Sequence, residues 1–221
     1  MRKIIISEGE YYHVCSRGVG KQSIFHNQGD YWRFLFLILY FQSSVTFDQL
    51  GRVLKEFVQH RMLDKMDTNE IIEKRQVEVV CFCIMPNHFH ILLKELKAGG
   101  ISKYMQRILN SYGKYYNTKY DKSGHVFQGK FRSVHIETNE QLLYLTAYIH
   151  KNPNGLSQNT GKEAVYFWSS FQDYIQENRW EKLLNPGIVL EQFKTKKEYG
   201  NFVSSSTAKN IGNEIEEIIL E

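Results

Sequence analysis

The chain has 221 residues, of which 42% are hydrophobic, 14% aromatic and 24% charged, with 3 prolines and a formal net charge of +4. This composition is typical of a folded globular protein and excludes a disordered, collagen-like or mucin-like chain. The longest unbroken apolar stretch, residues 34–41, is far shorter than the roughly 20 residues that span a membrane, and residues 1–8 lack the apolar segment of a secretory signal. We therefore expect a cytoplasmic protein with no membrane partner.

The first third of the chain predicts a strand, a helix and an insertion. Residues 10–17 have the β-branched and aromatic character of a strand, which Gly18 and Gly20 end. Residues 30–41 are typical of a strongly apolar helix. Residues 43–75 also carry apolar positions at helical spacing, but they are more polar, so we interpret them as a helical insertion at the edge of the core.

The middle of the chain predicts a β-hairpin followed by a long helix. Residues 76–85 are rich in Val, Ile, Phe and Cys, which is typical of a buried strand. Pro86 and Asn87 turn the chain, and residues 88–94 supply the partner strand. Residues 101–120 have the spacing of an amphipathic helix.

A further extended segment and a capped helix follow. Residues 126–136 have extended character. Thr138 and Gln141 have the spacing of a capping box, which predicts that a helix begins there. This helix ends by Asn152, because a residue that precedes proline is disfavoured in the helical region.

Strands and helices in this order indicate one antiparallel sheet with helices packed on one face, which is an α+β fold. Residues 154–163 are typical of a surface linker. Beyond them, the sequence predicts a helical extension that packs on the sheet domain through four aromatic residues: Trp168, Phe171, Tyr174 and Trp180.

The pair His88 and His90 is the sharpest candidate for a binding site. Side chains two apart on a strand point to the same side, so both imidazoles can converge on one cation, while Phe89 and Ile91 point to the opposite face. Imidazole pairs are good metal ligands, and a metal with an open position can bind a phosphate oxygen. Taken alone, the pair favours two ordinary histidines on a partly exposed sheet face over a metal site.

The cysteines offer a different metal site. Three cysteines do not form a disulfide framework, which favours a reducing compartment. Cys81 and Cys83 lie in the predicted buried strand and are best interpreted as small core residues. A zinc site that joined them to the histidine pair would have a spacing that differs from the usual zinc fingers.

Three polar residues recur on the helix that begins after Thr138. Tyr144, Tyr148 and Asn152 are spaced by four, so they share one face of that helix. Asn152 lies at the negative end of the helix, a favourable place to face a cation. The same spacing also occurs in ordinary packing, so it gains weight only beside the histidine pair.

Basic charge is concentrated in residues 97–135, where eight Lys and Arg side chains stand against one acidic residue, Asp121, whereas residues 213–221 carry four glutamates and no base. Tyr and Phe residues are interleaved with the basic ones. Cations bind phosphates and flat rings stack on unpaired bases, so this segment is a candidate for binding single-stranded nucleic acid. A solvated helix face beside a tyrosine core stripe is equally compatible with the pattern.

Several segments resemble the repeat-associated (REP-associated) tyrosine transposases, a family of single-tyrosine HUH transposases. They are residues 12–18 (YHVCSRG), 83–93 (CIMPNHFHILL), 124–133 (GHVFQGKFRS), 148–153 (YIHKNP) and 168–171 (WSSF). The resemblance covers about residues 10–200, interrupted by the insertion.

The resemblance implies a ferredoxin-like catalytic sheet and a DNA-cleaving enzyme. Such enzymes bind single-stranded DNA with hairpin or palindromic repeats, and they cleave and rejoin it through a 5′-phosphotyrosine with Mg²⁺ or Mn²⁺ as cofactor. By this likeness Tyr148 is the nucleophile, His88 and His90 bind the metal, and Asn152 is the position of a third, amide ligand.

The same likeness sets the expected domain organisation. Residues 1–155 form the catalytic domain, with the helical insertion at about 43–75, and residues 156–221 form a C-terminal helical extension. Arginine and lysine supply phosphate contacts to DNA. The candidate DNA-binding residues are Arg17, Lys114, Gln128, Lys130 and Arg132. Lys130 and Arg132 are two apart, so on a strand they would face one way.

Two other functions stay open at this stage. One is a non-catalytic single-stranded nucleic-acid-binding protein that keeps the fold, and the other is a metal hydrolase that acts through activated water. Tyr144 is the alternative nucleophile, followed by Tyr115 and Tyr116. We expect a monomer or a homodimer.

Overall fold

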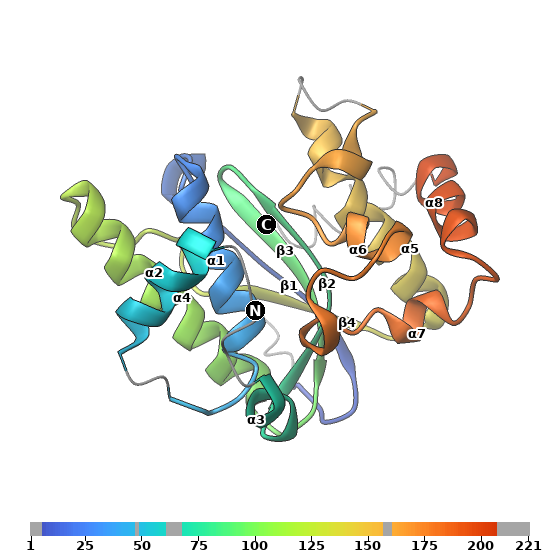
Figure 1. Ribbon diagram of the computed structural model, residues 1–221, viewed down its shortest axis with the longest axis horizontal. Helices are drawn as coiled ribbons and strands as arrows, with labels where there is room; N and C mark the ends of the chain where they lie inside the picture. Colours follow the sequence, from blue (N-terminus) through green and yellow to red (C-terminus); the bar gives the residue numbers. More distant parts are fainter. Residues whose placement is uncertain (1–5, 47–48, 61–67, 157–160, 207–221) are drawn as a thin grey trace.

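The computed structural model describes residues 6–46, 49–60, 68–156 and 161–206. A four-stranded antiparallel sheet with the strand order β2-β3-β1-β4 lies at its centre (Figure 1). The strands are β1 (Tyr11–Arg17), β2 (Val77–Met85), β3 (His88–Glu95) and β4 (Arg132–Ile136). The hairpin that the sequence predicts is the pair β2 and β3, in which Met85 lies opposite His88.

Helices α1 (Gln28–Tyr40) and α4 (Gly100–Tyr120) cover one face of the sheet. Side chains alternate along a strand, so every second residue of β3 points to these helices, and Phe89 packs on Phe34 with their ring centroids 4.8 Å apart. Apart from the insertion, the order of elements is β1, α1, β2, β3, α4, β4. This order and the strand arrangement are ferredoxin-like, and the expected α+β fold class is confirmed.

Helix α5 (Asn139–Lys151) lies on the other side of the sheet (Figure 1). It begins with the capping box predicted from Thr138 and Gln141. Leu145 and Ile149 of this helix belong to a second buried cluster that also contains Leu92 of β3. The sequence predicts helices on one face of the sheet. This holds for α1 and α4, whereas α5 packs on the opposite face.

The insertion extends the core beyond α1. Its described part contains α2 (Leu50–His60) and α3 (Thr68–Glu73), as the helical pattern predicts. Phe57 of α2 meets Trp32 of α1 edge to face, with ring centroids 5.7 Å apart. Residues 47–48 and 61–67 of the expected insertion lie outside the described residues.

The chain after α5 covers the outer edge of β2. Its elements are η2 (Asn152–Gly155), η4 (Glu163–Val165), α6 (Phe171–Ile175), η5 (Glu181–Leu183), α7 (Gly187–Leu190) and α8 (Lys196–Ser205). A separate short turn, η1 (Val19–Lys21), follows β1. The amide of Ile84 donates to the carbonyl of Trp168 at 2.9 Å, and the amide of Ser170 donates to the carbonyl of Phe82 at 3.0 Å. The backbone of β2 at Phe82 and Ile84 is therefore paired on both sides, and β2 is buried throughout.

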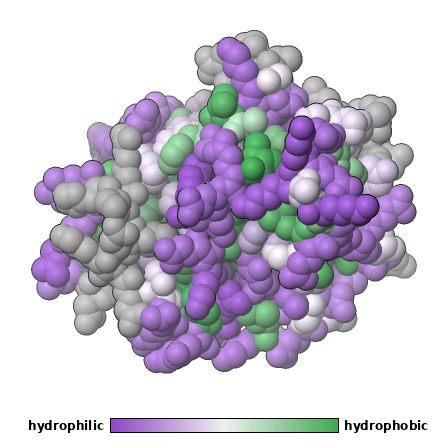
Figure 2. Space-filling view, turned by 45° about the vertical axis from the view of Figure 1, so that its right-hand side comes forward, coloured by the Kyte–Doolittle hydropathy of each residue, from purple (hydrophilic) through white to green (hydrophobic). Residues whose placement is uncertain are grey.

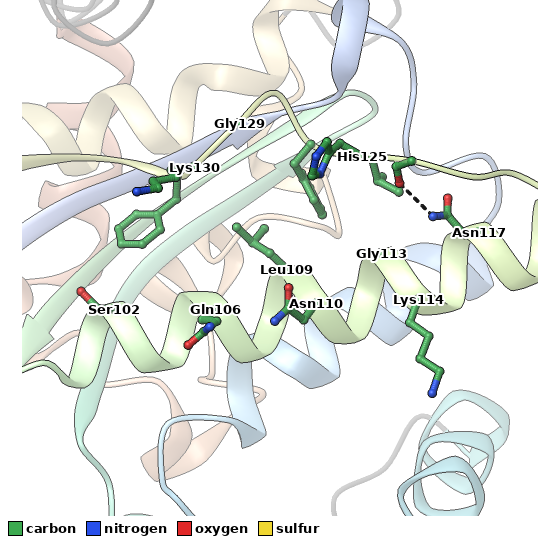
Figure 3. A pocket seen from close by; sticks show the side chains of 14 residues that line it. Ser102, Gln106, Leu109, Asn110, Gly113, Lys114, Asn117, His125, Gly129 and Lys130 are labelled. Carbon is green, nitrogen blue, oxygen red and sulfur yellow. Dashed lines mark hydrogen bonds between the residues drawn. The ribbon is translucent and has the colours of Figure 1, made fainter. Parts of the chain in front are cut away.

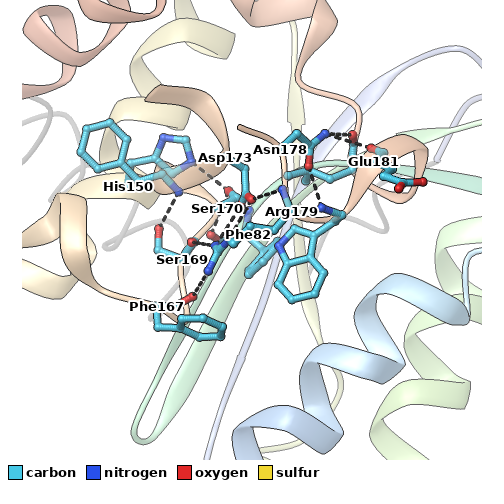
Figure 4. Close-up of polar contacts among 12 residues, drawn as sticks. Phe82, His150, Phe167, Ser169, Ser170, Asp173, Asn178, Arg179 and Glu181 are labelled. Atoms are coloured by element: carbon cyan, nitrogen blue, oxygen red, sulfur yellow. Dashed lines mark hydrogen bonds and ion pairs between the residues drawn. The ribbon is translucent and has the colours of Figure 1, made fainter. Parts of the chain in front are cut away.

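Buried polar contacts hold this covering segment in place (Figure 4). The guanidinium of Arg179 donates to both carboxylate oxygens of the buried Asp173, at 2.9 and 2.8 Å, and to the carbonyls of Phe167 and Ser169. His150 of α5 contacts the hydroxyl of Ser170 at 2.9 Å. From the side of α5 to α8, the surface is mostly hydrophilic with small separate hydrophobic areas (Figure 2). The expected acidic tail, residues 213–221, lies outside the described residues.

The segment before β4 is less regular than its sequence suggests. Of the predicted extended residues 126–136, the strand itself contains Arg132–Ile136, and Phe127 makes a single bridge to Gly18. Gly129 has a φ of +72°, a left-handed conformation that glycine adopts readily and that breaks the extended path. Among the described helices, none has the length and apolar character needed to cross a membrane.

Candidate active site

His88 and His90 project from β3 toward the side of the sheet that α5 covers. Their ring centroids lie 5.0 Å apart and their planes are nearly perpendicular, at 89°. Phe89 and Ile91 belong to the core cluster on the other face, as the alternation of strand side chains predicts. On the neighbouring strand β1, Arg17 lies opposite His88. The two imidazoles thus lie on one face of the sheet, beside Arg17.

The His90 ring is held by a second histidine. Nδ1 of His90 lies 2.9 Å from Nε2 of His13, and the two rings are nearly parallel. The other ring nitrogen of His90, Nε2, is buried and has no hydrogen-bond partner among the described residues. Burial lowers the pKa of His13 to about 3, and burial with the nearby His88, His13 and Arg17 lowers the pKa of His90 well below its usual value. Both rings are neutral at neutral pH, which is the state in which imidazole binds a metal.

His88 connects the hairpin to the end of α5. Its Nε2 lies 3.2 Å from Oδ1 of Asn152, and its Nδ1 lies 2.6 Å from Oδ1 of Asn87. Asn152 is the capping residue directly after α5, and its side-chain amide donates to the carbonyl of Tyr148 at 3.4 Å. The three predicted metal ligands are therefore close to one another. Nε2 of His88, the unpartnered Nε2 of His90 and the amide oxygen of Asn152 form a donor set that fits a divalent ion.

Tyr148 completes the group. It lies on α5 with 7% of its surface exposed, and its ring centroid is 5.4 Å from that of His90. Tyr148, His88 and Asn152 line the same pocket, which has a volume of about 410 Å³ and is also bordered by Lys151. The predicted nucleophile and two predicted metal ligands thus meet at one cavity.

The alternative tyrosines lie elsewhere. Tyr144 packs on Phe202 of α8, with ring centroids 6.0 Å apart. Tyr115 and Tyr116 belong to α4, on the other side of the sheet, where the Tyr115 hydroxyl donates to the buried carboxylate of Asp30 at 2.8 Å. None of the three lines the pocket of Tyr148.

The cysteines do not form the zinc site considered from the sequence. Cys81 and Cys83 are buried, and burial raises the pKa of both thiols, so they stay protonated. Within the described residues, the group of three side chains that could share a metal ion is instead His13, Cys15 and His90, whose ligand atoms lie within 4.8 Å of one another. His13 has no role in the sequence analysis. The alternation of His13, Cys15 and Arg17 along a predicted strand could have placed it on the face of His90.

Two of the predicted DNA contacts lie on the face of the histidines. Arg17 is close enough to His90 for its charge to contribute to the lowered pKa of that ring, and its Nε is buried without a hydrogen-bond partner among the described residues. Arg132 on β4 lies opposite Cys15, which faces His90 across β1 and β3. Both arginines are half-buried.

Two others, Lys114 and Lys130, line a second pocket of about 520 Å³, which lies between α4 and the segment before β4 (Figure 3). Gln128 lies in that segment with its side chain exposed, and its amide donates to the carbonyl of Arg17. Lys130 and Arg132 do not share a strand, because β4 begins at Arg132, and Lys130 borders the pocket at α4.

A third and smaller pocket, of about 190 Å³, lies between these two. It shares Asn117 and His125 with the pocket at α4. It shares Ser23 with the pocket of Tyr148. The three pockets are therefore neighbours, arranged around the loop after β1.

Comparisons with known proteins give two findings. Residues 45–152 match the family model described as "Transposase IS200 like". A solved structure described as "Structure of the REP associates tyrosine transposase bound to a REP hairpin" is similar in fold, with a TM-score of 0.53 and 13% sequence identity over 81% of this chain and 86% of that chain. A search of curated proteins found no match. The two findings confirm the resemblance drawn from the sequence motifs.

Proposed function

Because residues 45–152 belong to the family of IS200-like transposases, we propose that this protein binds hairpin-containing single-stranded DNA and cleaves and rejoins it through Tyr148. The observation that carries this proposal is the common pocket of Tyr148, His88 and Asn152, with the His90 ring 5.4 Å from the phenol ring. A metal-dependent transposase needs a nucleophile and metal ligands at one place, and this pocket supplies side chains for both.

His88, His90 and Asn152 would hold Mg²⁺ or Mn²⁺. The orphaned Nε2 of His90 and the close approach of His88 Nε2 to the amide oxygen of Asn152 support this assignment. A divalent ion bound there would polarise the scissile phosphate and offset its negative charge. Neutral imidazoles suit the role, because protonated rings could not donate a lone pair to a cation.

Tyr148 acts as the nucleophile in this proposal. Its phenolic oxygen attacks the phosphorus and loses its proton to solvent, while the bond from phosphorus to the 3′ oxygen breaks and that oxygen takes up a proton. The products are a 5′-phosphotyrosine and a free 3′-hydroxyl. Since one phosphoester replaces another, a second 3′-hydroxyl can reverse the step and join a new strand without ATP.

The three neighbouring pockets are the proposed path of the DNA. Lys114 and Lys130 at the α4 pocket offer two cations for phosphates, and Phe131 in the same pocket offers a ring on which a base can stack. Arg17 and Arg132 add positive charge on the face of the histidines. The similar solved structure holds a REP hairpin, which supports hairpin DNA as the substrate class here.

The catalytic side chains of this proposal all come from one chain, so it requires no second copy. We assign them to a catalytic domain of residues 1–155, with residues 156–221 as an extension. The contacts of the extension with the edge of β2 and with α5 support its role as a structural cover.

The test is an incubation of the full chain with 3′-labelled hairpin DNA, with Mn²⁺ or with a chelator, followed by a denaturing gel. The proposal predicts a slowly migrating protein–DNA adduct that requires Mn²⁺, is lost in Tyr148→Phe and persists in the control Tyr144→Phe. Binding without any product in either condition would identify a non-catalytic single-strand binder. Cleavage without an adduct, retained in Tyr148→Phe, would identify a hydrolase that uses activated water.

A further inference from the structure

We propose that His13 is a positioning residue, which holds His90 in the tautomer that can bind the divalent ion. This inference rests on the proposed function, since it concerns the role of His90 as a metal ligand. It assigns a role to a side chain that neither lines the pocket of Tyr148 nor belongs to the expected ligand set.

The two rings form a rigid pair inside the protein. Nε2 of His13 and Nδ1 of His90 are 2.9 Å apart, the ring planes differ by 11°, and the centroids are 5.1 Å apart. His13 is 1% exposed and His90 is 4% exposed, so water does not compete for this contact. On the paired strands, His13 lies opposite Leu92, which places His90 at the diagonal position, still within reach of a long side chain.

One hydrogen is shared between these two nitrogens, and its place decides what His90 can do. If His13 donates, the proton of neutral His90 sits on Nε2, and that nitrogen cannot bind a cation. If His90 donates from Nδ1, its Nε2 presents a lone pair. That Nε2 is the buried nitrogen with no partner among the described residues, which a metal ion would satisfy.

The second arrangement makes His13 a hydrogen-bond acceptor. Its own proton is then on Nδ1, which is likewise buried without a partner in the described part of the chain. A group that fixes the tautomer and the orientation of a ligating imidazole typically changes metal affinity 10- to 100-fold when it is removed. We therefore expect His13 to act on metal binding and not on the DNA itself.

Two substitutions separate this role from simple packing. His13→Leu keeps a buried side chain of comparable bulk but has no acceptor, so Mn²⁺ should bind about 10- to 100-fold more weakly. His13→Gln offers its amide oxygen near the place of Nε2 and should restore most of the affinity. The matched control is Leu92→Val, which shortens a buried apolar side chain opposite His13 on β3 but leaves the acceptor in place.

The measurements are Mn²⁺ titration by electron paramagnetic resonance and the ¹⁵N NMR shifts of the His90 ring in the metal-free full chain. Wild type and His13→Gln should carry the His90 proton on Nδ1, and His13→Leu should show a mixture of tautomers. Thermal melts establish that each variant is folded.

The outcomes distinguish the two proposals. A metal-free wild type with its His90 proton on Nε2, or a folded His13→Leu that binds Mn²⁺ as tightly as wild type, overturns the role of His13 and leaves the proposed function standing. A wild type that binds no Mn²⁺ overturns both. Weakened binding in His13→Leu, recovered in His13→Gln and unchanged in Leu92→Val, supports the role.

Discussion

The amide oxygen of Asn152 lies 3.2 Å from Nε2 of His88, so the end of helix α5 meets the start of strand β3. This polar contact joins two segments more than 60 residues apart in the sequence. One partner lies at a helix end with its negative dipole, so the place is favourable for a cation.

Asn152→Ala tests this relationship. The substitution removes the amide oxygen, and we expect Mn²⁺ to bind at least about tenfold more weakly, while the fold and hairpin binding stay intact. Calorimetric titration with Mn²⁺ measures the change. The control is Asn154→Ala, two residues further on, whose amide contacts Glu163 and Gly161 and should leave the affinity as it is. Equal Mn²⁺ affinity in wild type and Asn152→Ala would remove Asn152 from the ligand set.

Lys114→Ala and Lys130→Ala test the pocket at α4 as a DNA site. Each lysine that contacts a phosphate releases about one counterion, so each variant should bind hairpin DNA more weakly and lower the slope of log affinity against log salt by about 0.7 to 0.9. Fluorescence anisotropy at several salt concentrations measures both quantities. Lys103→Ala is the control, because Lys103 is also exposed on α4 but does not line the pocket. If Lys103→Ala lowers the slope as much as the other two, the effect belongs to net charge and not to this pocket.

We predict that acid weakens the hydrogen bonds through which Asp30 of α1 contacts α4. Burial alone would raise its pKa, but hydrogen bonds from Lys119, Tyr120, the His26 amide and Tyr115 outweigh burial and lower the pKa below its usual value. The carboxylate therefore stabilises the fold fully above the unfolded pKa of about 4, and this contribution is lost as the pH falls through the lower folded pKa.

The corresponding variant is Asp30→Asn. At pH 7 we expect it to lower the free energy of unfolding by about 2 kcal/mol, since it leaves an ammonium and two hydroxyls with a weaker acceptor. The difference from wild type should shrink as the pH drops below about 4. Urea unfolding at several pH values measures it. A difference that stays constant down to pH 2 would show that the charge of Asp30 contributes nothing.

The pair Asp173 and Arg179 should matter for stability more than an exposed ion pair. Asp173 is fully buried and accepts from Arg179 at 2.9 and 2.8 Å, so Asp173→Ala should cost about 3 kcal/mol. Glu56→Gln is the control, because Glu56 pairs with Arg52 on the surface at 3.9 Å, and we expect a cost below about 0.5 kcal/mol. Thermal unfolding of the two variants compares them. Similar melting temperatures for both would mean that the cover on β2 is held by other contacts.

Much of the fold follows from local patterns in the sequence. The capping box at Thr138, the buried hairpin, and the common face of His88 and His90 depend on spacing alone, and all three are present. The side of the sheet on which α5 packs does not follow from spacing. In its last two turns, residues 145–150 are all buried, so no polar face marks the outer side.

Spacing alone predicts the parts of the site that share an element, and only the family resemblance joins Tyr148 and Asn152 to the histidines. His13 reaches His90 across two strands, and the register that brings them together depends on pairings distant in the sequence. Lys130 lies outside β4, next to the left-handed backbone of Gly129, which composition does not reveal. The proximity of Tyr148 to His90 results from the packing of α5 on β2 and β3, a tertiary contact that no single pattern encodes.

Because residues 168–170 cover β2, the two edges of the sheet differ. Residues 168–170 pair with the backbone of β2 at Phe82 and Ile84, whereas no described residue pairs with the outer side of β4. Sheets grow by adding a strand to a row of free backbone groups, so growth is open at one side and blocked at the other. Two copies joined through β4 would turn only blocked margins outward, and such an assembly would stop at two and could not propagate into a fibre.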